Sequence, residues 1–132
     1  MKIILGYFLT FLSFFLIDML WLGFLAKGVY KKYLGSIIGQ EVNWPPAMIF
    51  YLLFVLGVVV FVIWPAIEKN SLTHAILFGL FFGLVTYATY DLTNYATIKN
   101  WPLQIVLIDL AWGSVLSMIV AFVGFYIFKY LK

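Results

Sequence analysis

The chain has 132 residues, of which 66% are hydrophobic and only 10% charged, and its mean hydropathy is +1.11. A soluble domain carries about 25% charged residues, so this composition excludes an ordinary globular protein. The high apolar content also excludes a disordered chain, and the lack of cysteine excludes a secreted disulfide scaffold. The eight basic residues are all lysine and form no basic cluster, so the sequence indicates no nucleic-acid partner. An integral membrane protein is the class that remains.

Four stretches of the chain have the roughly 20 apolar residues that a membrane-spanning helix needs. They cover about residues 3–26, 46–64, 74–97 and 103–128. The first lacks a small-residue cleavage site and is expected to be a retained helix rather than a signal peptide. None of the four shows the two-residue alternation of a membrane β-barrel. We therefore expect an all-α membrane bundle of four helices, with residues 1–132 forming a single transmembrane domain.

Prolines are placed at the edges of these spans. Pro45 and Pro46 open the second span and Pro102 opens the fourth, where the missing N–H is tolerated because the first helical turn has unpaired donors in any case. Pro65 is expected to end the second helix. Asn-Trp-Pro precedes both the second and the fourth helix, which is consistent with two tandem helix pairs and equally with coincidence.

The connections between the spans differ in length. The first, from Lys27 to about Pro45, is long enough for a short interfacial helix with Tyr30 and Tyr33 at the level of the lipid headgroups. The other two are short turns, which make helices two and three, and three and four, antiparallel neighbours. The aromatic side chains at the span ends are expected to be interfacial anchors; among them are Trp44, Trp64 and Trp101.

The lysines do not fix the orientation of the chain. Four lie on the face that carries both ends of the chain and four on the opposite face, so the positive-inside rule has no excess to count. We expect both termini in the cytoplasm, and the balanced count also permits insertion in both directions.

Three of the five acidic residues lie inside the spans, namely Asp18, Asp91 and Asp109. At 1.5 Å per helical residue, each carboxyl is about 10–14 Å below the face that carries the first and third connections. A charged carboxylate facing lipid would cost about 2.5–3.5 kcal/mol, so we expect all three to face inward. No lysine lies near that depth. The carboxyls are therefore neutral by protonation, hydrated in a cavity, or bound to a cation from outside.

Further polar and aromatic side chains accompany these acids. Tyr87, Asp91 and Asn94 share one face of the third span, and Tyr90 is adjacent. Trp21 and Trp112 follow Asp18 and Asp109 by three residues, so each indole N–H could donate to the carboxyl of its own helix or line a shared pocket. We predict that these eight residues form a pocket that binds protons or a cation. With no cysteine and a single histidine, we predict no metal centre and no cofactor.

Small residues recur every fourth position on the third and fourth spans and end at an aspartate. The two ridges are Ala75–Gly79–Gly83–Tyr87–Asp91 and Asp109–Gly113–Ser117–Ala121. Such ridges let two membrane helices approach closely. We therefore expect these two helices to pack tightly, with the acids at one end of the contact.

Several motifs resemble those of a known family. They include Asp18-x-x-Trp21-x-Gly23, the run from Tyr87 to Asn94, and Asp109-x-x-Trp112–Gly113. Tyr33–Leu34–Gly35, Phe50–Tyr51, Pro65–Ala66 and Trp101–Pro102 extend the similarity over nearly the whole chain. Together they resemble a bacterial family of small four-helix membrane proteins of unknown function. The resemblance implies a multi-pass protein of the bacterial inner membrane, but it supplies no activity, substrate or cofactor.

Three functions are consistent with these patterns. The first is a proton- or cation-coupled carrier or binder of a small or amphipathic molecule, with Asp91 as the principal titrating group. The second is a membrane-embedded enzyme that acts on a lipid or isoprenoid and uses an aspartate as general acid. The third is a structural or assembly subunit in which the acids only link helices. The lipid bilayer is the expected partner in each case, and a homodimer is expected because four helices enclose little volume.

Overall fold

The computed structural model describes residues 1–25, 27–35 and 43–131, and all regular structure in these ranges is helical. The elements are α1 (Lys2–Leu20), η1 (Trp21–Leu25), α2 (Lys27–Leu34), α3 (Trp44–Val58), η2 (Val59–Ile63), α4 (Trp64–Glu68), α5 (Leu72–Thr97) and α6 (Leu103–Leu131). Four continuous helical stretches are long and apolar enough to cross a membrane: Lys2–Phe24, Trp44–Glu68, Leu72–Thr97 and Leu103–Leu131. These confirm the predicted all-α membrane bundle. The predicted end of the first span at residue 26, part of the first connection (36–42) and Lys132 lie outside the described residues.

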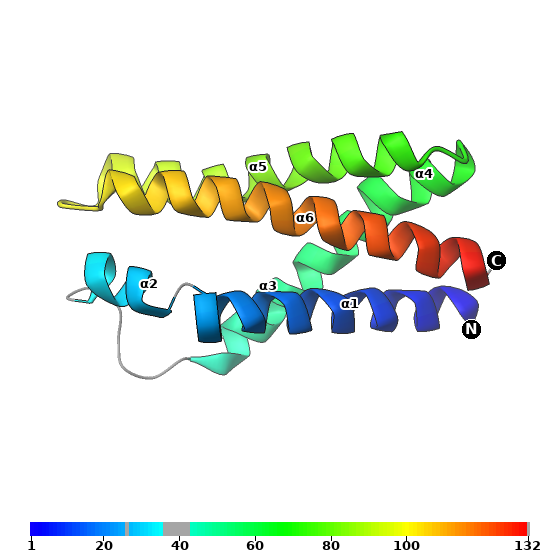
Figure 1. Ribbon diagram of the computed structural model, residues 1–132, viewed down its shortest axis with the longest axis horizontal. Coiled ribbons are helices and arrows are strands. Elements are labelled where there is room, and N and C mark those ends of the chain that lie inside the picture. The colour runs from blue at the N-terminus through cyan, green and yellow to red at the C-terminus, as the bar shows by residue number, and fades with distance from the viewer. Residues whose placement is uncertain (26, 36–42, 132) are drawn as a thin grey trace.

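The helices α1, α5 and α6 run alongside one another, and the second span crosses them at an angle (Figure 1). The first and last described residues lie at the same end of the bundle, and α2 lies at the opposite end. The helix α6 packs against both α5 and α1, whereas the contact between α1 and α3 is smaller. The first and second spans are therefore packed less closely against each other than the third and fourth spans are.

The sequence predicts that the second helix ends at Pro65, but in the structure the helix continues past this residue. A π-helical turn, η2, leads into α4, which contains Pro65 and continues to Glu68. In this wider turn the N–H of Trp64 donates to the carbonyl of Val59, five residues earlier. A proline inside an α-helix lacks a donor and its ring clashes with the preceding turn. The widened turn just before Pro65 is where such a clash would fall, and the helix continues past it.

The contact between α5 and α6 is formed by the two small-residue ridges. A Cβ atom at Gly79 would lie 2.7 Å from the Cβ of Ala121, and one at Gly83 would overlap the carbonyl oxygen of Gly113. At Gly113 an added Cβ would overlap the ring of Tyr87. The two ridges thus face each other in an antiparallel register, as predicted, and glycine is required because the backbones leave no room for a side chain.

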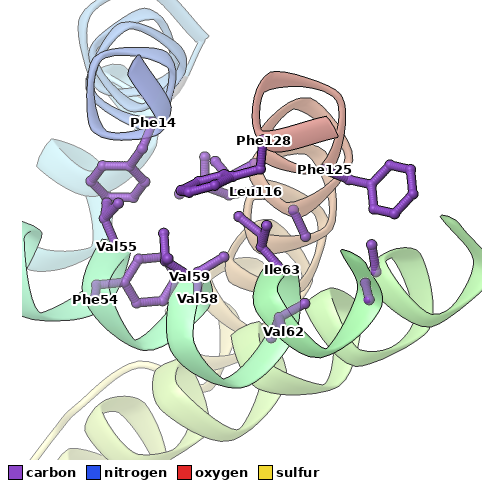
Figure 2. Close-up of a cluster of buried hydrophobic side chains, with 14 residues drawn as sticks. Phe14, Phe54, Val55, Val58, Val59, Val62, Ile63, Leu116, Phe125 and Phe128 are labelled. Carbon is purple, nitrogen blue, oxygen red and sulfur yellow. The ribbon is translucent and has the colours of Figure 1, made fainter. Parts of the chain in front are cut away.

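Most of the buried apolar side chains form one cluster in the half of the bundle near the ends of the chain. Figure 2 shows Phe14 of α1 pointing toward Phe54 and Val55 of α3, with Leu116 and Phe128 of α6 beside them. The rings of Phe14 and Phe54 lie 5.3 Å apart. Ala75 of α5 also belongs to the cluster, which therefore joins all four spans.

A second, smaller apolar cluster lies at the other end and holds α2 on the bundle. Leu34 of α2 packs with Trp101, Ile105 and Val106, and the flanking α2 residues in contact are Val29, Tyr30 and Tyr33. Lys31 and Lys32, on the other face of α2, are exposed. The amphipathic pattern of α2 therefore places its apolar side on the start of α6.

We expect Gly83→Ala to destabilise the protein by about 1–3 kcal/mol, because the added methyl group forces apart two backbones that are in contact. The measurement is thermal unfolding in detergent. Gly23→Ala is the matched control: nothing lies within 4 Å of its added Cβ, so the change is expected to stay within about 0.5 kcal/mol. Equal unfolding temperatures for the two variants would contradict the close contact of α5 and α6.

Candidate functional site

Asp18, Asp91 and Asp109 come from three different helices and are all buried, with exposed fractions of 5%, 0% and 7%. We call these three residues the acid cluster. Along α6, Asp109 follows the residues of the small apolar cluster and precedes those of the large one. The acid cluster therefore lies between two apolar clusters, and all three carboxyls face the interior of the bundle.

The carboxyl of Asp18 on α1 interacts with side chains of two other helices. The indole N–H of Trp112 on α6 donates a hydrogen bond to it over 3.3 Å. The phenol of Tyr51, in the middle of α3, lies beside the same carboxyl. Asp18 thus joins the first span to the second and the fourth.

The carboxyl of Asp109 on α6 accepts a hydrogen bond from the hydroxyl of Tyr30 on α2. The Tyr30 oxygen in turn accepts the indole N–H of Trp21 over 3.3 Å. Burial raises the pKa of the Tyr30 phenol, and its hydrogen bond to Asp109 raises the pKa further, so this hydroxyl keeps its proton. The position of Tyr30 at headgroup level stays a prediction, but its phenol points into the bundle. The apolar side of α2 faces the bundle, and this orientation directs the phenol inward.

The two tryptophans are stacked, with ring centroids 4.3 Å apart and an angle of 8° between the planes. Each indole is connected to the acid of the other helix: Trp112 bonds to Asp18 directly, and Trp21 reaches Asp109 through Tyr30. The expected bond from an indole to the acid three residues before it is therefore not formed. The stack between helices fixes the direction of both N–H groups, and this overrides the spacing along one helix.

The carboxyl of Asp91 on α5 differs from the other two. Neither of its oxygens has a hydrogen-bond partner within the described ranges, although both are fully buried. Its neighbours are the Asp109 carboxyl and the indole of Trp101. The buried N–H of Trp101 also has no hydrogen-bond partner among the residues that the structure describes. Trp101 was expected to be an interfacial anchor, but it is covered by α2 and belongs to the small apolar cluster.

The remaining predicted site residues lie at different distances from the acid cluster. The ring of Tyr87 packs on Gly113, and its neighbours include Asp18 and Asp109. Tyr90 is 56% exposed, and its ring meets that of Trp101 edge-on at 6.0 Å. Asn94, half-buried, is a neighbour of Tyr90. The structure therefore brings Tyr87, Trp21 and Trp112 to the acids, while Tyr90 points outward.

Sequence reasoning missed two members of the site, Tyr30 and Tyr51. The signal for Tyr30 was the spacing of Val29, Tyr30, Tyr33 and Leu34, which places all four on one side of a short helix. Tyr51 had no comparable signal, since α3 is apolar on all sides. In the described residues, no group of three acidic or histidine side chains could hold a metal ion.

We expect the stacked indoles to produce a paired circular-dichroism band that is lost in both Trp21→Leu and Trp112→Leu, because such coupling requires two indoles held close together in a fixed relative orientation. The control is Trp64→Leu, a change at an exposed tryptophan outside the site. A band that survives either of the first two substitutions would contradict the stack.

Comparisons with known proteins agree with this architecture. Residues 3–126 match the family described as "Predicted membrane protein (DUF2177)". No curated protein and no solved structure gives a match. The match spans all four apolar helices and includes every residue of the acid cluster. The chain therefore belongs to the DUF2177 family of predicted membrane proteins.

Proposed function

We propose that this chain is a proton-coupled carrier of a small cationic or amphipathic molecule, and that the acid cluster is the site where the molecule replaces a proton. The observation that carries the proposal is Asp91, whose two oxygens are fully buried and receive no hydrogen bond from any donor in the described residues. Leaving a buried polar group unpaired costs about 1–3 kcal/mol. A proton on Asp91 supplies an O–H that can donate to the neighbouring Asp109 carboxyl, and a bound cation would contact the oxygens directly, so either one lowers this cost.

The charges around Asp91 favour a positively charged ligand. Asp109 is its neighbour, and Asp18 contributes a third carboxyl to the same interior. No lysine of the sequence lies in the middle of a span, so no side chain neutralises the acids at this depth. Two neighbouring carboxyls cannot both be ionised without a counter-charge, and the exchange of a proton for a cation supplies one.

The aromatic side chains of the site favour an organic cation. The rings of Trp21, Trp112 and Tyr87 lie among the carboxyls, and the phenols of Tyr30 and Tyr51 bond to or adjoin two of them. Aromatic faces attract ammonium groups, and the attraction grows when water is excluded. The same rings offer apolar surface to an amphipathic molecule.

In this structure the site is closed. All three carboxyls are at most 7% exposed, and α2 covers the end of the bundle next to them. We assign this conformation to the protonated carrier without ligand. The proposal further places the chain in the bacterial inner membrane as a homodimer with both termini in the cytoplasm, because four helices alone enclose little volume for a transported molecule.

Binding of tetraphenylphosphonium to the purified protein is expected to release protons in a weakly buffered solution near neutral pH. This probe is a permanent cation without a titratable group, so any released proton comes from the protein. Asp91→Asn is expected to release none, because its amide has no acidic proton to give up. Glu68→Gln is the matched control, since Glu68 is an exposed acid outside the site. Binding without proton release by the native chain, or no binding at all, would refute the exchange.

The carrier role is tested separately in sealed vesicles with tetraethylammonium, a cation that crosses a bilayer poorly. An imposed pH gradient is expected to drive its accumulation in vesicles with the native chain and with Glu68→Gln, but not with Asp91→Asn. Equal accumulation with Asp91→Asn would show that the acid cluster does not couple transport to protons.

A further inference from the structure

We infer that Tyr30 is a positioning residue that keeps Asp109 as the ionised member of the buried pair and so leaves the exchangeable proton on Asp91. The inference rests on the proposed function for its meaning, but its evidence is the direction of the hydrogen bonds around the three carboxyls. It assigns a role to α2, which would otherwise only cover the end of the bundle.

The donors around the acid cluster are distributed unevenly. Asp18 receives the Trp112 N–H and Asp109 receives the Tyr30 O–H, whereas Asp91 receives no hydrogen bond from the described residues. A donated hydrogen bond stabilises the charged form of a carboxyl and disfavours its protonated form. In this neighbouring pair, Asp109 accepts a hydrogen bond and is thus the more favourable site for the negative charge. Asp91 is then the more favourable site for the proton.

The direction of the Tyr30 hydrogen bond is fixed by its other partner. A phenol has one hydrogen, and the Tyr30 oxygen already accepts the Trp21 N–H, which is a donor only. The phenol hydrogen is therefore free to point at Asp109, and it stays in place because burial raises the pKa of Tyr30. The hydrogen bonds therefore run in one direction, from the Trp21 N–H to the Tyr30 oxygen and from the Tyr30 hydroxyl to Asp109.

The other titratable groups near the pair do not reverse this asymmetry. They are Asp18 from α1, Tyr51 from α3, and Tyr87 and Tyr90 from α5. Tyr51 lies beside Asp18, and Tyr90 is exposed on the outer side of α5. The geometry therefore leaves Tyr30 as the donor that distinguishes Asp109 from Asp91.

This arrangement gives α2 a chemical part in the exchange. When α2 is seated, Tyr30 stabilises the charge on Asp109 and the proton rests on Asp91. When α2 leaves the bundle, Asp109 loses its donor and the two carboxyls become nearly equivalent. The position of a short helix at the membrane surface thus determines which acid holds the proton.

The test is infrared spectroscopy of the ligand-free protein in lipid near neutral pH, which follows the C=O stretch of protonated carboxyls. The native chain is expected to show a band that Asp91→Asn removes and Asp18→Asn retains. Tyr30→Phe is expected to shift or split this band, because the proton is then shared between Asp91 and Asp109. Tyr33→Phe is the matched control, and the band should stay in place. Like Tyr30, Tyr33 lies on α2 and packs against the small apolar cluster, but it bonds to no acid in the described ranges.

A second variant guards against misfolding of Tyr30→Phe. Trp21→Phe keeps an aromatic ring in the stack but removes the N–H that orients Tyr30, so we expect a smaller shift in the same direction. An unchanged band in Tyr30→Phe that has native circular dichroism, or a band that survives Asp91→Asn, would overturn the inference. No ligand is used, so a failure here leaves the carrier proposal standing with the proton elsewhere. Failure of the tetraphenylphosphonium experiment likewise leaves this assignment intact.

Discussion

The structure depends on one constraint: three carboxyls at a similar depth of an apolar bundle have to face one another instead of lipid. This fixes the rotation of α1, α5 and α6 about their axes, since each must turn Asp18, Asp91 or Asp109 inward. Once the rotations are set, the glycine ridges of α5 and α6 meet, because they lie on the same helix faces as the acids. The stacked tryptophans then hold η1, at the end of the first span, against α6.

The helix α6 has the central position in this arrangement. It contacts α5 through small residues, the first span through the indole stack with Trp21 of η1 and the bond from Trp112 to Asp18, and α2 through the small apolar cluster. Its two ends are embedded in different apolar clusters, and its only acid lies between them. A carboxyl placed in this way is shielded on both sides along the helix axis, so its partners must come from neighbouring helices.

The fold could be predicted from the sequence to a large extent, and the site less so. The four spans, the inward direction of the acids and the contact between α5 and α6 follow from length, hydropathy and four-residue spacing, which are properties of single helices. The partners of each acid were not predictable in this way. Trp112 follows Asp109 by three residues yet bonds to Asp18, because the stack of two indoles from different helices decides where their N–H groups point. The bond from Tyr30 to Asp109 was not predictable for a related reason: it depends on how α2 packs on the end of the bundle, which composition alone does not determine.

The two π-helical turns have a mechanical consequence. Both η1 and η2 lie in the first two spans, while α5 and α6 are uninterrupted and in backbone contact. A π turn contains one residue more than a regular α-helical turn and interrupts the helical hydrogen-bond pattern locally, whereas the backbones of α5 and α6 touch along their glycine ridges. Asp91 and Asp109 therefore lie on two uninterrupted, closely packed helices, whereas Asp18 lies in a span that contains a π turn. A change in the twist of the first span at its π turn would alter the separation of Asp18 from the other two acids and leave the spacing of Asp91 and Asp109 constant.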